Sequence, residues 1–433
     1  GTFIINGGTT INVTGATTLS NNHPMQWNGD FTFTGTNTLA FGTGAVTLGN
    51  NCAITASAST LTVGGAISGA YSIIKAGAGT LVLSNASNTY SAGTTISAGT
   101  LNFGSLSAVG NIIFTGGTLQ YAAGNTQDIS ALIKNSTSAI TIDTNSNNVT
   151  FSSVIGSSNT AGLTKSGSGI LTLSNTNTFT GAVNFNAGTI NATTIGNLGN
   201  GTALTFAGGT LQFNGVFDPS SRTMTFNAGG ATFDTGANSI TFANSIGNSG
   251  AGGLTKSGAG TLTLSGANTF TGGVTLSAGT LNINNAQALG TVAGTFIING
   301  GTIDNTSAAA ITTNAYPMTW GGDFTFTGTK DLNLGTGATS MSAARQVTVN
   351  GGTLTVGGII SGAGYRLTKA GAGTLTLSGA NTFTGGVTLS AGTLNINAVA
   401  ALGTVAGTFI INGGIIDNTS AAAITTNAYP MTW

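Results

Sequence analysis

The sequence predicts an all-β protein that folds as a parallel β-helix, or β-solenoid, with about 20 residues in each coil. Three observations predict this fold. One long segment occurs four times, apolar and polar residues alternate along it, and Gly-Thr-apolar tripeptides recur at nearly even intervals. Self-similarity of this kind indicates stacked repeats, in which each repeat contacts only its neighbours. We therefore expect a single continuous β-solenoid over residues 1–433.

The clearest copy of the repeated segment is Gly253–Gly290, which reads GLTKSGAGTLTLSGANTFTGGVTLSAGTLNINNAQALG. The other copies cover Ile74–Gly110, Leu163–Gly199 and Arg366–Gly403. One lysine marks each copy, and the last interval between these four repeat lysines is longer than the first two by about one coil: Lys75, Lys165, Lys256 and Lys369.

Strands are predicted from the alternation inside each copy. Thr261–Ser265 and Thr280–Asn284 alternate polar with apolar residues, which is typical of half-buried strands. Gly and Asn interrupt these runs, as expected at turns. Gly-Thr-apolar tripeptides begin at nearly even intervals, for example at Gly352, Gly373 and Gly392, which gives the predicted coil length.

The repeats divide the chain into units of two lengths that differ by about one coil. Their approximate bounds are 1–110, 111–199, 200–293, 294–406 and a partial unit at 407–433. Both ends of the sequence fall inside a unit, so we expect a piece of a longer protein. Neither end has a polar cap, which predicts self-association end to end or laterally.

Charge is scarce, with nine Lys and Arg, nine Asp and no Glu. Charged residues make up 4% of the chain, against about 25% in ordinary soluble domains. Zero net charge predicts no nucleic-acid partner. No apolar run is long enough to predict membrane insertion. Since Cys52 is the single cysteine, no internal disulfide is possible. This composition is typical of extracellular proteins of bacterial surfaces.

Two sets of residues are candidates for function. The repeat lysines are interpreted as solubilising charges that discourage pairing at sheet edges. Segments with a Met-x-Trp pattern follow a proline in each long unit and either pack in the core or form a contact surface for sugars or a partner. The candidate contact residues are Met25, Trp27, Met318, Trp320 and Trp433. Asparagines at matching turn positions are expected to form side-chain ladders: Asn177, Asn268 and Asn381.

The core of each repeat, LTKSGAGTLTLSGANTFTGGVTLSAGTLNI in the copy at Gly253–Gly290, resembles the autotransporter-associated β-strand repeat, also called the passenger-associated transport repeat. The resemblance implies a right-handed parallel β-helix in a secreted or surface-displayed bacterial passenger region. Such regions commonly serve as stalks, adhesins or aggregation factors.

Catalysis is the less favoured alternative, although parallel β-helices also host polysaccharide-degrading enzymes. Hydrolysis of sugars requires two carboxylates about 5 to 10 Å apart. Asp143 and Asp234 are equivalent in the two short units, as are Asp30 and Asp323 in the long ones. Equivalent positions lie four or five coils apart, roughly 20 Å, which is too far for one site. We interpret these aspartates as turn caps or as solvated side chains.

Other chemistry is equally weakly supported. His23 and Cys52 make a Cys–His nucleophile conceivable, and no His/Cys spacing typical of a metal site occurs. We therefore expect no catalytic residue, no cofactor and no metal. Stacked threonines, such as Thr32, Thr34 and Thr36, or Thr261 and Thr263, favour a surface that matches an ice lattice as a binding alternative.

These observations predict a non-catalytic structural or adhesive protein of a bacterial surface, either a stalk or a filament-forming β-solenoid, located at the cell surface or outside the cell. Its expected partners are other copies of itself, surface glycans or other cells. The alternative is a ligand-binding β-helix surface, for glycan or ice.

Overall fold

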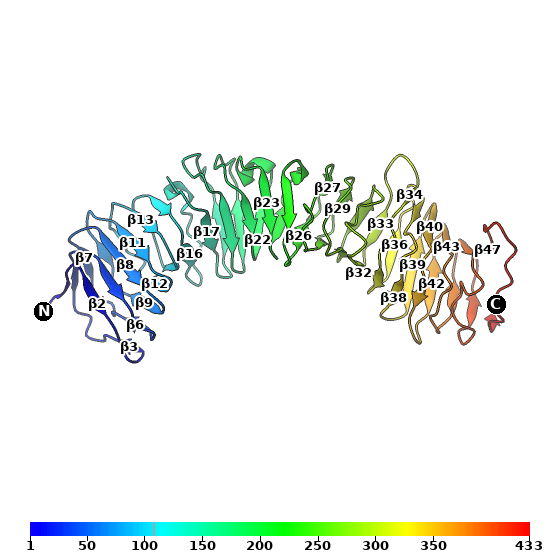
Figure 1. Cartoon of the computed structure of the whole chain (residues 1–433), viewed down its shortest axis with the longest axis horizontal. Coiled ribbons are helices and arrows are strands. Elements are labelled where there is room, and N and C mark those ends of the chain that lie inside the picture. The colour runs from blue at the N-terminus through cyan, green and yellow to red at the C-terminus, as the bar shows by residue number, and fades with distance from the viewer. Residues whose placement is uncertain (107–108) are drawn as a thin grey trace. The chain divides into compact units, whose positions relative to one another are not determined.

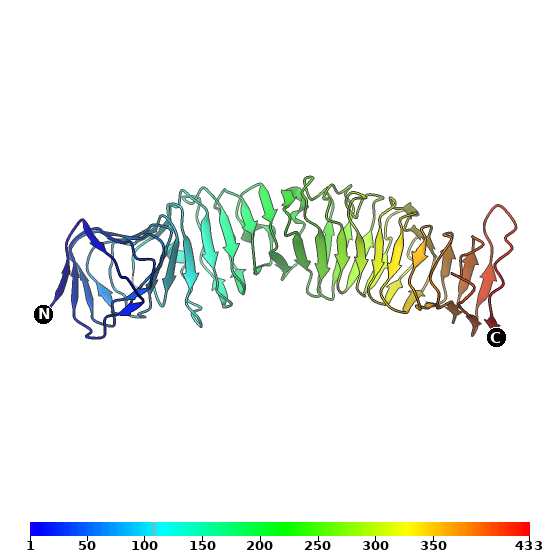
Figure 2. The same cartoon turned by 60° about the horizontal axis from the view of Figure 1, so that its bottom comes forward.

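The computed structural model describes residues 1–106 and 109–433 and confirms the predicted all-β parallel solenoid (Figure 1). Strands of successive coils lie side by side (Figure 2), and each pairs in parallel with its equivalent in the coil before and the coil after. Among the described residues the only helices are short 3-10 turns: η1 (Ser130–Leu132), η2 (Ile195–Leu198) and η3 (Pro219–Ser221). The chain divides into two compact units, Gly1–Thr205 and Phe206–Trp433.

In unit 1, three ladders of strands run along successive coils. The first contains β1 (Phe3–Ile5), β4 (Met25–Trp27), β7 (Val46–Leu48) and β10 (Ile67–Ser68). The second contains β2 (Thr9–Ile11), β5 (Phe31–Phe33), β8 (Cys52–Ala56), β11 (Ile73–Ala76), β13 (Thr94–Ile96) and β15 (Ile112–Phe114). The third contains β3 (Thr17–Thr18), β6 (Leu39–Ala40), β9 (Thr60–Val63), β12 (Thr80–Leu83), β14 (Thr100–Phe103), β16 (Thr118–Tyr121), β17 (Ile140–Asp143), β19 (Leu163–Ser166) and β21 (Val183–Phe185). A further ladder begins with β18 (Asn148–Phe151), β20 (Ile170–Leu173) and β22 (Thr189–Ala192).

Unit 2 is built in the same way. One ladder contains β24 (Thr210–Phe213), β26 (Ala231–Asp234), β28 (Leu254–Ser257), β30 (Val274–Leu276), β32 (Phe296–Ile298), β35 (Met318–Trp320), β38 (Thr339–Met341) and β41 (Ile360–Ser361). A second contains β27 (Ser239–Phe242), β29 (Thr261–Leu264), β31 (Thr280–Ile283), β33 (Thr302–Asp304), β36 (Phe324–Phe326), β39 (Arg345–Val349), β42 (Leu367–Ala370), β44 (Val387–Leu389), β46 (Phe409–Ile411) and β48 (Met431–Thr432). The third contains β34 (Ile311–Thr312), β37 (Leu332–Asn333), β40 (Thr353–Val356), β43 (Thr374–Leu377), β45 (Thr393–Ile396) and β47 (Ile415–Asp417). The remaining strands are β23 (Ala203–Phe206) and β25 (Thr223–Phe226).

The core follows directly from the period of two. In β12, Leu81 and Leu83 point inward and are buried, while Thr80 and Val82 are half-exposed on the outside. Leu81 pairs with Leu61 of the coil before and Leu101 of the coil after, so identical side chains stack along the axis. Each buried Leu contributes about 1.5–3 kcal/mol by removal of apolar surface from water.

Candidate functional site

The repeat lysines are buried, not exposed. None of the four side chains has measurable solvent exposure. Lys256 shares the inward face of β28 with Leu254, because residues two apart in a strand point to the same side. The prediction that these lysines are surface charges that guard sheet edges is therefore wrong.

Each buried ammonium is held by backbone carbonyls alone. Lys256 Nζ donates to the carbonyl oxygens of Ser257 and Gly258 at 2.8 Å, and to that of Ala278, one coil further, at 3.1 Å. An ammonium has three donors, so these three bonds satisfy it fully. The corresponding acceptors at 2.6–3.5 Å are Ala76, Gly77 and Ala98 for Lys75, Ser166, Gly167 and Ala187 for Lys165, and Ala370, Gly371 and Ala391 for Lys369.

Burial disfavours the charged form of these lysines. Desolvation lowers the pKa of each repeat lysine from 10.5 to about 8. The negative charges of Asp143 and Asp234 oppose this shift at Lys165 and Lys256 respectively. Carbonyl oxygens also favour the protonated form. The ammonium is therefore a cation at neutral pH, held in place by backbone carbonyls, and not a free amine nucleophile.

A glycine with positive φ follows the acceptor alanine of each repeat lysine in the next coil, and for Lys165 and Lys256 this glycine makes room for the ammonium. Gly279 follows the acceptor Ala278 and has φ +71°, a conformation that side chains rarely adopt. A Cβ at Gly279 would also collide with the carbonyl oxygens of Gly258 and Gly260 and lie 2.8 Å from Lys256 Nζ. The Ala-Gly-Thr segment of each repeat thus lies next to the lysine of the coil before it.

Buried asparagines connect three coils on the irregular side of the solenoid. The backbone N–H of Ile246 donates to Asn268 Oδ1 at 3.0 Å, and Asn268 Nδ2 donates to the carbonyl of Ala288 at 2.6 Å. Asn177 and Asn381 make the equivalent pair of bonds. Each asparagine therefore replaces ladder bonds where no regular strand forms.

The expected asparagine ladder is wrong in one respect. Asn177, Asn268 and Asn381 belong to successive repeats and lie several coils apart, since the coil after Asn268 already contains its bonding partner Ala288. They do not stack on each other. The recurring Asn-Thr-Phe-Thr sequence identified these asparagines as equivalent, but it did not indicate which coils their side chains connect.

The family model described as passenger-associated-transport-repeat matches residues 73–103, 163–192, 254–283 and 367–396. Each match contains one repeat lysine and ends beyond the Ala-Gly step whose alanine carbonyl accepts a hydrogen bond from it. The chain carries four passenger-associated-transport repeats. The resemblance predicted from the sequence is thereby confirmed.

A relative extends this assignment beyond the repeats themselves. The chain is 31% identical over 361 residues to "Adhesin BmaC autotransporter" of Brucella suis biovar 1 (strain 1330). The similarity covers 76% of this chain and 10% of that adhesin, so the chain spans about a tenth of the length of its relative. No solved structure matches the chain.

The first two Met-x-Trp segments, Met25–Trp27 and Met318–Trp320, lie outside the passenger-associated-transport repeats and pack in the core. Trp27 and Trp320 are fully buried, and Met25 and Met318 are 3% exposed. The ring of Trp27 lies 5.2 Å from that of Phe31, in an edge-to-face arrangement. Of the two alternatives, core packing is the one that the structure shows for these four residues, because alternation in β4 and β35 turns both Met and Trp inward. Trp433 is 84% exposed and stays a predicted contact residue.

The equivalent aspartates of this repeat protein bind backbone and side-chain amides. Asp143 accepts from Gln120 Nε2 and from the backbone N–H of Asn145, both at 2.8 Å. Asp234 makes the same pair of bonds with Gln212 and Gly236 at 2.9 Å. The carboxylates of the long units accept backbone N–H groups one coil ahead: Asp30 from Ala53 and Asp323 from Gln346. The contacts of Asp143 and Asp234 fit the expected role as turn caps, whereas Asp30 and Asp323 bind strand N–H groups of the next coil, in β8 and β39.

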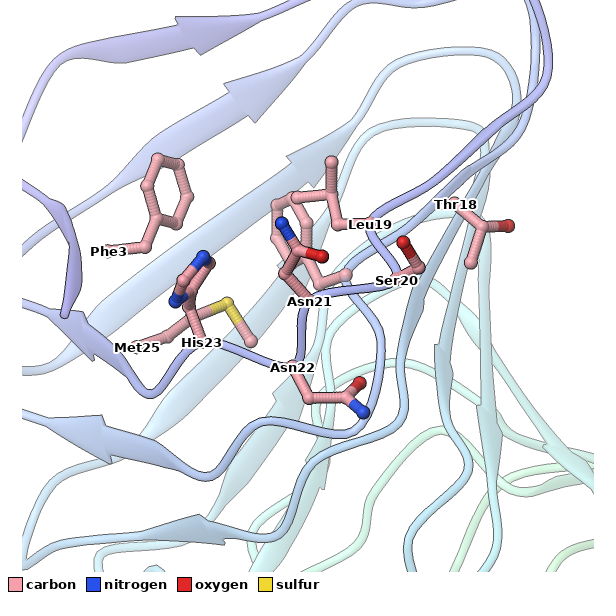
Figure 3. Close-up of a pocket in the computed structure, with 9 residues that line it drawn as sticks. Phe3, Thr18, Leu19, Ser20, Asn21, Asn22, His23 and Met25 are labelled. Carbon is pink, nitrogen blue, oxygen red and sulfur yellow. The ribbon is translucent and has the colours of Figure 1, made fainter. Parts of the chain in front are cut away.

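His23 and Cys52 do not share a site. His23 lines a pocket of about 280 Å³ beside Phe3 and Met25 (Figure 3), and Cys52 is not among the residues that line it. The Cys52 thiol donates to the Gly29 carbonyl at 3.0 Å, and burial raises its pKa to about 12. A neutral, buried thiol is a poor nucleophile.

The pocket in Figure 3 is lined by His23, whose equivalent in the fourth unit packs one coil against the next. Tyr316 is the equivalent of His23 in the fourth unit, and its hydroxyl donates to the Gly290 carbonyl of the coil before at 2.8 Å. The His23 pocket therefore corresponds to a coil-packing surface.

Within residues 1–106 and 109–433, no group of three or more His, Cys, Asp or Glu side chains could hold a metal ion. The described helices also include none with the length and apolar character to cross a membrane.

Proposed function

We propose that this chain is part of the passenger region of a bacterial autotransporter adhesin and serves a structural and adhesive role outside the cell. The similarity to an autotransporter adhesin over 76% of the chain carries this proposal. Four passenger-associated-transport repeats support it, because each contributes coils to the solenoid. The solenoid acts as a stalk that displays or forms an adhesive surface.

A non-catalytic role explains the hydrogen bonds of the candidate catalytic aspartates more simply than catalysis does. The candidate acids Asp143 and Asp234 each accept bonds from an amide side chain and from a turn N–H. The oxygens of these two aspartates are engaged in stabilising corners, which favours a structural role for them over acid–base chemistry.

Surface glycans, other cells and further copies of the chain are the proposed partners. A net charge of zero removes electrostatic repulsion between copies, which favours lateral association. Outward positions carry mainly Thr, Ser and Asn, whose hydroxyls and amides hydrogen-bond readily to sugars.

Beads coated with the purified chain test adhesion directly. We expect them to bind cultured cells or a glycan array, and to aggregate with each other, more than beads coated with the heat-denatured chain. Equal binding by both preparations, or turnover of a polysaccharide by the folded chain, contradicts the proposal.

A second candidate function rests on columns of threonine. In unit 1 the third ladder aligns half-exposed threonines on five successive coils, at Thr60, Thr80, Thr100, Thr118 and Thr141. A regular row of hydroxyl and methyl groups at the roughly 4.8 Å strand spacing suits a crystalline surface such as ice. Thermal hysteresis that disappears in Thr100→Lys would favour this function, and its absence in the parent chain rejects it.

A further inference from the structure

The core of the solenoid gives little information about register. Inward positions are filled by Leu, Ile, Val and Phe, and the same Thr-Leu-Thr-Leu strand occurs in β29 and β43. A strand that slips by two residues keeps its apolar side chains inward, because the side-chain period is two. Apolar packing alone therefore discriminates weakly between the correct register and a slipped one.

The repeat lysine is an exception to this interchangeability. Lys256 occupies an inward ladder position between Phe233 of the coil before and Leu276 of the coil after. A buried ammonium is costly unless acceptors surround it. Two of its acceptors, Ser257 and Gly258, directly follow it in the chain, so a slip of the strand leaves these two bonds unchanged.

The third acceptor and the space for the ammonium belong to the next coil. Ala278 supplies the carbonyl, and Gly279 supplies a position without a side chain, where a Cβ would lie 2.8 Å from Lys256 Nζ. A slip of β28 against β30 by two residues would bring Ser277 or Leu281 toward this place instead of Gly279. The ammonium would then lose an acceptor and meet a side chain.

The same match occurs in every copy. Lys165 Nζ lies 2.7 Å from the position of a Cβ on Gly188, which follows the acceptor Ala187. Lys75 and Lys369 also bond an alanine carbonyl that a positive-φ glycine follows. The pairing of lysine with the Ala-Gly step one coil later is thus a constant feature of the repeat.

We propose that each repeat lysine is a register key: a buried cation that fits one alignment of its strand with the next coil and disfavours the slipped alignments. The Ala-Gly step of the following coil supplies the carbonyl acceptor and the space that this cation requires. Buried polar groups fix register in the same manner in other folds, at a cost in stability. An apolar residue at this position would fill the core and leave the register less defined.

Disulfide formation during refolding tests the proposal. In a Cys52→Ala background, Thr255→Cys with Thr275→Cys reports the native register, because these half-exposed residues are ladder partners. Thr255→Cys with Ser277→Cys reports a two-residue slip. Each pair is placed in the full chain with Lys256, with Lys256→Met and, as a matched control, with Lys330→Met at an exposed lysine.

With Lys256 and with Lys330→Met, we expect the slip reporter to form at least tenfold less disulfide than the native reporter. In Lys256→Met, the slip disulfide should rise at least tenfold. Equal slip yields with Lys256 and with Lys256→Met overturn the proposal.

A transplant variant covers the case in which Lys256→Met does not refold. Lys256→Met with Leu276→Lys moves the lysine to the aligned position one coil later, where Ser277 and Ala278 follow it as Ser257 and Gly258 follow Lys256. If the transplant folds and forms the native-register disulfide, the result supports the proposal that the lysine fixes the register. Failure of the transplant to fold overturns the proposal, because a cation that recognises the next coil should also function at the aligned position, which faces Gly300 and Gly301.

Discussion

Lys256 Nζ lies 3.1 Å from the carbonyl oxygen of Ala278, one coil further along the chain. This bond joins a buried cation to a corner of the next coil without any carboxylate. All four repeats contain the same arrangement. The repeat is therefore defined by an interaction between coils as much as by its strands.

Stability should rise between about pH 8 and pH 9. The repeat lysines have a pKa of about 8 in the folded chain and 10.5 as an ordinary value. In this window the unfolded chain binds more protons, so the free energy of unfolding increases with pH, by at most about 1.4 kcal/mol per pH unit for each lysine. Urea unfolding at several pH values measures the slope.

Cys52 and Tyr316 limit the pH range over which stability rises. Burial raises the pKa of Cys52 to about 12 and of Tyr316 to about 12, so both favour unfolding as pH rises toward and past their ordinary values. In Lys256→Met the rise should be smaller than in the parent chain. A free energy of unfolding that falls from pH 8 to 9 in the parent chain contradicts the expectation.

Gly279→Ala should be much more harmful than Gly364→Ala. Both glycines have positive φ, but nothing lies within 4 Å of a Cβ at Gly364, whereas at Gly279 it meets two carbonyls and Lys256. We expect Gly364→Ala to cost about 1–2 kcal/mol from backbone strain. Gly279→Ala should cost about 1–3 kcal/mol more through overpacking. Equal costs in denaturant unfolding would show that the corner has room for a side chain.

Asn268→Ala should destabilise the chain by about 2 kcal/mol or more, because it leaves the Ile246 N–H and the Ala288 carbonyl buried without this partner. Asn350→Ala, at an exposed asparagine, is the matched control and should change stability by less than about 0.5 kcal/mol. Hydrogen exchange at Ile246 should also accelerate in Asn268→Ala. Unchanged protection there argues against the bridge.

Tryptophan quenching tests the buried position of the first two Met-x-Trp segments. Trp27 and Trp320 are fully buried and Trp433 is 84% exposed. Iodide should quench only the Trp433 component of the fluorescence. In Trp433→Phe the remaining emission should resist iodide, and strong quenching in this variant would place Trp27 or Trp320 at the surface.

The solenoid was predictable because its signals are local and repeated. Alternation in Thr261–Ser265 and the recurring glycines indicate strand, turn and coil length without tertiary information. The burial of Lys256 was also implied by alternation, since it is two residues from the inward Leu254. The general preference of lysine for water led to the opposite expectation.

Contacts between coils could not be derived from the sequence alone. The acceptor at Ala278 and the bridge from Asn268 to Ala288 depend on which coil follows which, and at what offset. Trp320 was ambiguous for a related reason, because a buried aromatic and an exposed binding aromatic have the same local sequence.

Amine labelling of the native chain, followed by peptide mass spectrometry, tests the central claim most directly. The chain has six lysines, of which Lys330 is exposed and Lys134 half-exposed, while the four repeat lysines are buried. We predict fast labelling of Lys134 and Lys330, and labelling of Lys75, Lys165, Lys256 and Lys369 only after denaturation. Labelling of the repeat lysines at the rate of Lys330 in the folded chain would contradict a buried ammonium at the coil corner.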